Sequence, residues 1–247
     1  IDVEFKDPKG KKRKRTLTVE RHRTYVDGPA ALPETLQTTK DLKYGTTPDG
    51  YGYVHVRRCK GDLPDQMDVA LEALGGAPGL ILDFRGNSGG GFDHDAFLGR
   101  FVPEGKKITF GKHIPSAGRR PYGGPVVVIV DGTVVSAGET GSGMFKEDGR
   151  AYMIGESPTA GMSSQKKTIE LPSRKLALYV SVASNKRRFN GGKGIEGIGV
   201  PPHETVVFDP EDLAKGNDTL ILRARALLAD FPQKAVPYKP KQFGWDD

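Results

Sequence analysis

The chain has 247 residues, of which 36% are hydrophobic and 28% charged, with a formal net charge of +6 at pH 7. This composition can fill the core of one large domain or two modest ones, which excludes a wholly disordered chain. The single cysteine, Cys59, excludes an internal disulfide framework and a cysteine-built zinc site, and no apolar run reaches the roughly 18 residues of a membrane-spanning helix.

Residues 1–25 predict a basic β-hairpin. Ile1, Val3 and Phe5 alternate with polar residues, and the Asp-Pro-Lys-Gly stretch that follows has the chemistry of a turn. The lysine- and arginine-rich run after the turn contains no aromatic residue for base stacking. We therefore interpret it as a solvated hairpin tip and expect no nucleic-acid partner. Residues 26–50, rich in glycine and proline, predict a linker.

Residues 51–230 predict a core domain of α/β class, in which strands and helices alternate through crossover connections. Apolar spacing and breakers place helices at 62–75, at 92–101 and from Ser136 onward, and buried strands at 79–84, 125–130 and 151–155. A hairpin is expected over 165–182. One final helix is expected to open at 209–212, with an apolar face that includes Leu213, Leu220, Leu227 and Leu228. Residues 231–247 predict a C-terminal tail.

A glycine-rich loop follows the buried strand at 79–84. Residues 85–91 read Arg-Gly-Asn-Ser-Gly-Gly-Gly, and successive glycines let the backbone approach a ligand and point amides at it. The loop lacks the Gly-Lys-Ser/Thr ending and the Gly-x-Gly-x-x-Gly spacing of nucleotide-binding loops. A nucleotide site is therefore disfavoured, and a structural turn or an anion-stabilising loop remains.

Ser136 follows a second buried strand and starts a predicted helix. With Glu139 three residues later, it fits an ordinary helix cap. It also fits a nucleophile on a strand-to-helix turn, where its own amide and that of Ala137 lie at the positive end of the helix. Taken alone, Ser136 favours the capping role.

Four segments in order resemble the C-terminal-processing (tail-specific) and tricorn-type serine peptidases. Residues 79–91 are similar to the Asp-x-Arg-x-Asn-x-Gly-Gly loop of that family and residues 125–139 to its nucleophile segment. Residues 149–156 are similar to the next strand, and residues 194–202 to the Ile-Glu-Gly-x-Gly-Val-x-Pro-Asp element. The resemblance implies a crotonase-like ββα superhelix preceded by a β-hairpin remnant of an N-terminal domain, a polypeptide substrate, and no metal or organic cofactor.

The resemblance also implies roles for individual residues. Ser136 takes the position of the nucleophile. The amides of Ala137 and of a glycine in the Gly89–Gly90 pair take the positions of the oxyanion hole. Glu196 matches the glutamate that orients a catalytic histidine in the tricorn-type branch.

The general base departs from the tail-specific pattern. Met162 stands where those proteases carry a lysine, and a thioether accepts no proton usefully. Lys166, Lys167 and His94 are weaker substitutes. We expect the base to be a histidine outside these 247 residues, in which case the chain by itself is slow or inactive.

Three hypotheses about function remain. The favoured one is a serine endopeptidase core. The alternatives are a catalytically impaired peptide- or ligand-binding module of the same fold, and a crotonase-type acyl-CoA enzyme. The resemblance favours an extracytoplasmic bacterial protein, periplasmic or secreted, over a cytoplasmic one, without membrane insertion and with oligomers possible.

Overall fold

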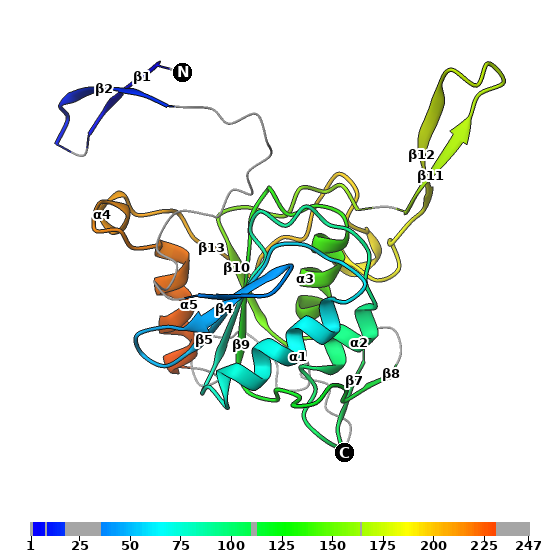
Figure 1. Ribbon diagram of the computed structural model, residues 1–247, viewed down its shortest axis with the longest axis horizontal. Helices are drawn as coiled ribbons and strands as arrows, with labels where there is room; N and C mark the ends of the chain where they lie inside the picture. Colours follow the sequence, from blue (N-terminus) through cyan, green and yellow to red (C-terminus); the bar gives the residue numbers. More distant parts are fainter. Residues whose placement is uncertain (1, 8, 18–35, 110–112, 164, 231–247) are drawn as a thin grey trace.

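A seven-stranded sheet forms the centre of the computed structural model, which describes residues 2–7, 9–17, 36–109, 113–163 and 165–230 (Figure 1). The strand order is β13-β10-β9-β6-β5-β4-β3. Strands β5, β6, β9, β10 and β13 are parallel, and β4 and β3 complete one edge in antiparallel pairing. In chain order the strands are β3 (Gln37–Thr38), β4 (Leu42–Thr46), β5 (Gly52–Val56), β6 (Leu80–Asp83), β9 (Val126–Val130), β10 (Tyr152–Gly155) and β13 (Glu204–Thr205).

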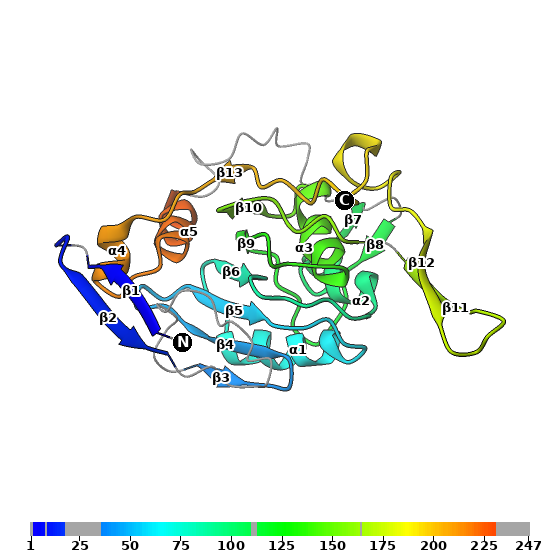
Figure 2. The same ribbon diagram turned by 90° about the horizontal axis from the view of Figure 1, so that it is seen from above.

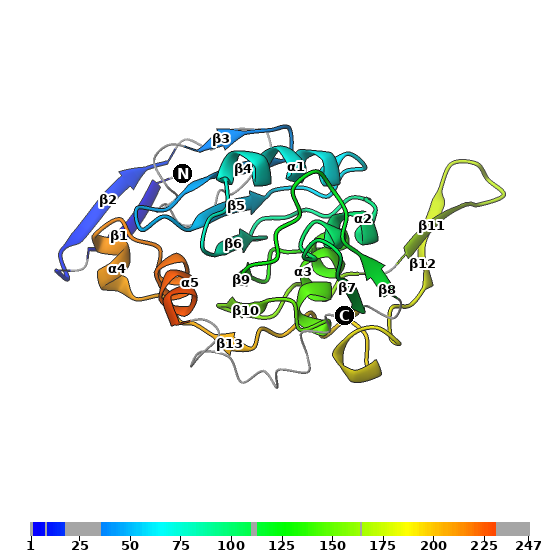
Figure 3. The same ribbon diagram turned by 90° about the horizontal axis from the view of Figure 1, so that it is seen from below.

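Helices cover both faces of this sheet (Figures 2 and 3). Helices α1 (Leu63–Leu74), α2 (His94–Gly99) and α3 (Ala137–Glu147) share one core, and α5 (Thr219–Asp230) packs on the other face. Neighbouring residues of one strand alternate between these cores: Leu80 and Leu82 belong to the first, and Ile81 to the second. This two-sided burial explains the continuous apolar runs in the sequence. The α/β class is confirmed.

In the described part of the chain, three separate hairpins accompany the sheet. They pair β1 (Asp2–Lys6) with β2 (Lys12–Thr16), β7 (Lys107–Thr109) with β8 (His113–Pro115), and β11 (Gln165–Glu170) with β12 (Ala177–Ala183). The first and the last project from the body of the molecule (Figure 1). The strand pairing expected near the N-terminus and over 165–182 is formed. A short 3-10 turn, η1 (Asn190–Gly192), follows the last hairpin.

The predicted linker over 26–50 was partly wrong, because β3 and β4 lie within it and join the sheet. Leu42 and Tyr44 are buried, so apolar alternation was present in the sequence. The Thr-Pro-Asp-Gly turn at 47–50 then returns the chain into β5. Residues 18–35, the first part of this linker included, lie outside the described residues.

The prediction of a single final helix was also wrong, because the chain forms α4 (Pro210–Ala214) and then α5. Gly216, with φ 76°, breaks the helix, and the Asp218 side chain accepts the Leu220 and Ile221 amides at the start of α5. Leu213 is therefore 44% exposed, whereas the other three predicted leucines are buried. Among the described residues, no helix has both the length and the apolar character needed to cross a membrane. The predicted tail at 231–247 lies outside them.

Candidate active site

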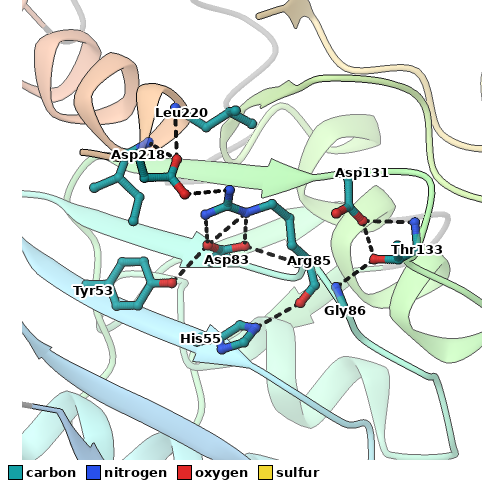
Figure 4. Close-up of polar contacts among 10 residues, drawn as sticks. Tyr53, His55, Asp83, Arg85, Gly86, Asp131, Thr133, Asp218 and Leu220 are labelled. Carbon is teal, nitrogen blue, oxygen red and sulfur yellow. Dashed lines mark hydrogen bonds and ion pairs between the residues drawn. The ribbon is translucent and has the colours of Figure 1, made fainter. Parts of the chain in front are cut away.

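The loops that follow β6 and β9 lie side by side, because the two strands are parallel neighbours. The Gly86 amide donates to Thr133 Oγ1 at 2.8 Å, a contact visible in Figure 4. The Val135 amide donates to the Asn87 carbonyl at 3.0 Å. The glycine-rich loop and the turn that carries Ser136 therefore meet at one edge of the sheet.

Asn87, which the sequence reasoning missed, shapes the glycine loop. Its fully buried side chain donates to the Val56 carbonyl at 2.7 Å and accepts the Gly89 amide at 2.8 Å. Because the Gly89 amide is engaged in this way, Gly90 is the member of the predicted pair whose amide can serve an oxyanion.

Glycine is the only residue that fits at position 89 and at position 90. A Cβ atom at Gly89 would lie 2.7 Å from the Ser136 Cβ, and one at Gly90 would overlap the Cys59 carbonyl. Both residues also have positive φ angles, 78° and 134°. The loop therefore approaches the serine more closely than any larger residue would allow.

The backbone of Ser136 is strained. Its φ of 55° and ψ of −122° lie outside the regions that residues with a side chain usually adopt. An ordinary helix cap is extended, as Asp93 is in this same chain, with φ −78° and ψ 104°. Such strain costs about 1–3 kcal/mol and persists where the surrounding structure enforces it, which happens most often at active sites. This geometry favours a nucleophile turn over a simple cap.

Glu139 holds the strained turn in place. One of its carboxylate oxygens accepts the Ser136 and Met162 amides, each at 2.9 Å. The other accepts Thr159 Oγ1 at 2.8 Å and the Gly161 amide at 2.7 Å. Burial raises the pKa of Glu139, and these hydrogen bonds oppose that shift. The sequence indicated only the capping contact, whereas the carboxylate joins the start of α3 to the 159–162 loop.

A pocket of about 480 Å³ lies over Ser136. Among the residues that line it are Gly90, Ser136, Ala137, His94, Ser163, Lys166 and Tyr179. The Ala137 amide is the first of α3 and has no acceptor within the helix. In the part of the chain that the structure describes, neither this amide nor that of Gly90 donates a hydrogen bond. Two amide donors thus remain available near the serine.

Glu196 lies at the rim of the site. Its side chain is 56% exposed and is not part of the pocket lining. Its carboxylate lies 3.8 Å from Lys166 Nζ, and Lys166 does line the pocket. The structure therefore brings four of the five predicted site residues together, namely Ser136, Ala137, Gly89 and Gly90, and holds Glu196 at the edge.

Two of the three weaker candidates for the general base, His94 and Lys166, are held by other side chains. His94 lies in the pocket with its Nε2 2.8 Å from Thr140 Oγ1 and its ring stacked on Phe92, and burial lowers its pKa. Lys166 Nζ donates to Ser181 Oγ at 2.8 Å. Met162 is largely exposed, and its backbone, rather than its thioether, contacts the nucleophile turn.

A buried ionic cluster anchors the base of the glycine loop (Figure 4). Arg85, whose side chain is 2% exposed, pairs with Asp83 through several hydrogen bonds and with Asp218 at 2.8 Å. Tyr53 donates to Asp83 at 2.8 Å. Burial tends to raise the pKa of Asp83, but the attraction of Arg85 is stronger and the pKa of Asp83 is lowered. Asp218 makes a single contact with Arg85, so burial prevails there and its pKa is raised. Asp218 could not be expected from local sequence.

Within the described ranges, no group of three or more histidine, cysteine, aspartate or glutamate side chains is placed to hold a metal ion. Near Ser136, His94 and Lys166 bond hydroxyl groups, and Glu139 accepts backbone amides and Thr159 Oγ1.

A mostly parallel α/β sheet that presents a strained serine beside two available amides defines a core of the serine-hydrolase class. The model of peptidase family S41 matches residues 50–206. The chain belongs to this family, so the resemblance seen in the motifs is confirmed.

Two curated relatives, both bacterial, are longer than this chain. A carboxyl-terminal-processing protease of Picosynechococcus sp. is 25% identical over 186 residues, which cover 72% of this chain and 44% of that protein. A protein of Chlamydia pneumoniae is 30% identical over 95 residues, which cover 38% of this chain and 15% of that protein. The chain therefore spans less than half the length of either relative.

Solved structures share the fold. Mature CPAF superposes with a TM-score of 0.65 at 13% identity, covering 95% of this chain and 68% of that one. The tricorn protease gives a TM-score of 0.56 at 21% identity, covering 73% of this chain and 18% of that one. These likenesses support the α/β fold, and the crotonase-like superhelix remains a prediction.

Proposed function

We propose that this chain is the peptidase core of a serine endopeptidase, which cleaves peptide bonds through an acyl-enzyme on Ser136. The observation that carries the proposal is the strained turn at Ser136, held by Glu139 beside the amides of Gly90 and Ala137. Membership of peptidase family S41 supports the reaction class. The substrate is an extended polypeptide.

In the proposed reaction, Ser136 Oγ attacks the scissile carbonyl carbon while its proton passes to a base. The carbonyl oxygen becomes an oxyanion that accepts hydrogen bonds from the Gly90 and Ala137 amides, and loss of one such donor typically costs about 10²–10³ in kcat. The base then protonates the leaving amine. Water, deprotonated by the same base, hydrolyses the acyl-enzyme and frees Ser136.

We propose that the base is a histidine outside these 247 residues and that Glu196 orients it. Two observations support this assignment. His94 Nε2 already bonds Thr140 in the pocket, and Glu196 stands at the rim, where a group from another part of the protein can reach it. Residues 1–25 would then form the end of the preceding domain. We further propose that the protein is extracytoplasmic and that it uses no metal or organic cofactor.

Labelling with a fluorophosphonate probe tests the nucleophile in the full-length protein. Ser136→Ala should abolish labelling, whereas Ser173→Ala, at an exposed turn, should retain it. Equal labelling of the Ser136→Ala protein would refute the assignment. His94→Gln should retain at least half of the labelling rate if the base lies elsewhere.

Labelling combined with two further assays, of peptide binding and of acyl-CoA turnover, separates the alternatives. A wild-type protein that binds peptide but is not labelled would indicate a binding module. Acyl-CoA turnover that survives both Ser136→Ala and Glu196→Gln would indicate a crotonase-type enzyme, because that chemistry needs the two amides but neither side chain.

A further inference from the structure

The loop that carries Glu196 is fixed on both sides of that residue. The Ile195 amide, just before it, donates to Asn185 Oδ1 at 2.9 Å. The Gly197 amide, just after it, donates to the Gly161 carbonyl at 2.8 Å. Ile195 is fully buried, whereas the Glu196 side chain is 56% exposed. The backbone of this loop is therefore held in place although the carboxylate lies at the rim of the site.

Asn185 joins this loop to the nucleophile turn. Its Nδ2 donates to the Ser163 carbonyl at 2.7 Å, and Ser163 Oγ donates to the Ser136 carbonyl at 3.0 Å. Because the Asn185 oxygen accepts the Ile195 amide and its nitrogen faces a carbonyl, only one orientation of the side-chain amide satisfies both contacts. Two side chains therefore connect the Glu196 loop to the backbone of Ser136, with a hydrogen bond at every step.

A second connection between the same two loops runs through Gly161. Its amide donates to Glu139 at 2.7 Å, and the other oxygen of that carboxylate accepts the Ser136 amide. Gly161 has a φ of 73°, and a Cβ there would lie 3.0 Å from backbone nitrogens in 197–199. The two connections thus hold the peptide units on both sides of Glu196, and they reach both the amide and the carbonyl of Ser136.

We propose that Asn185 is a positioning residue, which fixes the Glu196 loop relative to Ser136 and so sets where Glu196 can orient the base. This inference rests on the proposed function. Misplacement of a catalytic group by about 1 Å can cost about 100-fold in rate, so such a connection has a kinetic consequence. Asn185 also lines the pocket over Ser136 and a neighbouring pocket of about 390 Å³, so direct contact with substrate is the competing role.

Labelling of the full-length protein with a peptidyl fluorophosphonate, at several probe concentrations, tests this role. Asn185→Ala should lower the maximal labelling rate about tenfold and leave the half-saturating probe concentration unchanged. In a Glu196→Gln background the same substitution should lower the rate less than about twofold, because Asn185 acts through Glu196. Asn217→Ala, between α4 and α5, should label like the parent protein in each background. An equal loss in both backgrounds, as a merely structural role or substrate contact would give, would overturn the proposal.

A second variant covers the case in which Asn185→Ala does not fold. Ser163→Ala removes one hydroxyl group and breaks the same connection beside Ser136. It should show the same dependence on Glu196, and an equal loss with and without the Glu196 carboxylate would again overturn the proposal.

Hydrogen exchange followed by mass spectrometry tests the connection without any reaction. Asn185→Ala directly frees only the Ile195 amide, so faster exchange at other amides must come from loosening of the loop. We expect at least two amides of residues 194–199 to exchange about tenfold faster, and acceleration of one amide or none would overturn the proposal. A parent protein that is not labelled at Ser136 would refute the proposed nucleophile, whereas the exchange rates report on Asn185 alone.

Discussion

Removal of the Asp218 carboxylate should destabilise the fold through the loss of two contacts, an ion pair and a helix cap. Asp218 pairs with the buried Arg85 at 2.8 Å and has a fully buried side chain. Its second oxygen accepts the Leu220 and Ile221 amides at 3.0 and 3.1 Å. Breaking a buried ion pair costs about 3–5 kcal/mol, and we take about 3 because Asp83 still neutralises Arg85.

The helix cap adds about 1 kcal/mol. We therefore expect Asp218→Ala to lower the free energy of unfolding by about 4 kcal/mol and Asp218→Asn, which keeps an oxygen for the cap, by about 3 kcal/mol. Urea unfolding followed by circular dichroism measures both values, with m unchanged. Glu204→Ala is the control, because it breaks a partly exposed pair with Arg223 and should cost less than about 1 kcal/mol. Costs below about 1 kcal/mol for both Asp218 variants would refute the reasoning.

Three further predictions concern the loops and the pH dependence of stability. Gly90→Ala should abolish fluorophosphonate labelling, since its Cβ would overlap the Cys59 carbonyl, whereas Gly91→Ala, with open space around its Cβ, should label like wild type; equal rates would contradict the loop geometry. Glu139→Gln replaces an oxygen that accepts two amides with a donor, so the free energy of unfolding should fall by about 2–4 kcal/mol in urea titrations, and a loss below about 0.5 kcal/mol would argue against that network. Burial first, and Glu147 second, raise the pKa of Asp148 from 3.8 to about 8, so between these pH values the folded state holds a proton that the unfolded state has lost. The free energy of unfolding should therefore fall as pH rises through that window, and Asp148→Asn should reduce the fall by at least about 1 kcal/mol between pH 5 and 8; parallel curves for the two proteins would exclude the effect.

The centre of the fold could be predicted because its signals are local. Strands β6 and β9 are short continuous apolar runs, and α1 ends at a glycine in the left-handed conformation, Gly75. Strand β4 was missed because turn residues surround it and only two apolar residues, Leu42 and Tyr44, carry its alternation. The division of the final helix was signalled by Gly216 and Asp218, but an apolar spacing that continued across them concealed it.

The site could be predicted in part for the same reason. Ser136 and the glycines follow adjacent strands, so their meeting depends only on strand order. Asn87, Asn185 and Asp218 act through contacts with distant backbone or side-chain groups, and no local pattern specifies those partners. The exposed position of Glu196 likewise depends on loop packing rather than on its motif.

The Arg85–Asp218 pair has a consequence for the timing of assembly. The two residues are 133 positions apart, so a ribosome must add more than half of the chain after Arg85 before the second carboxylate exists. Until then the guanidinium lacks that neighbour, and the loop next to Ser136 lacks one of its anchors. The loop beside Ser136 therefore gains this anchor only after the segment that carries Asp218 has been synthesised.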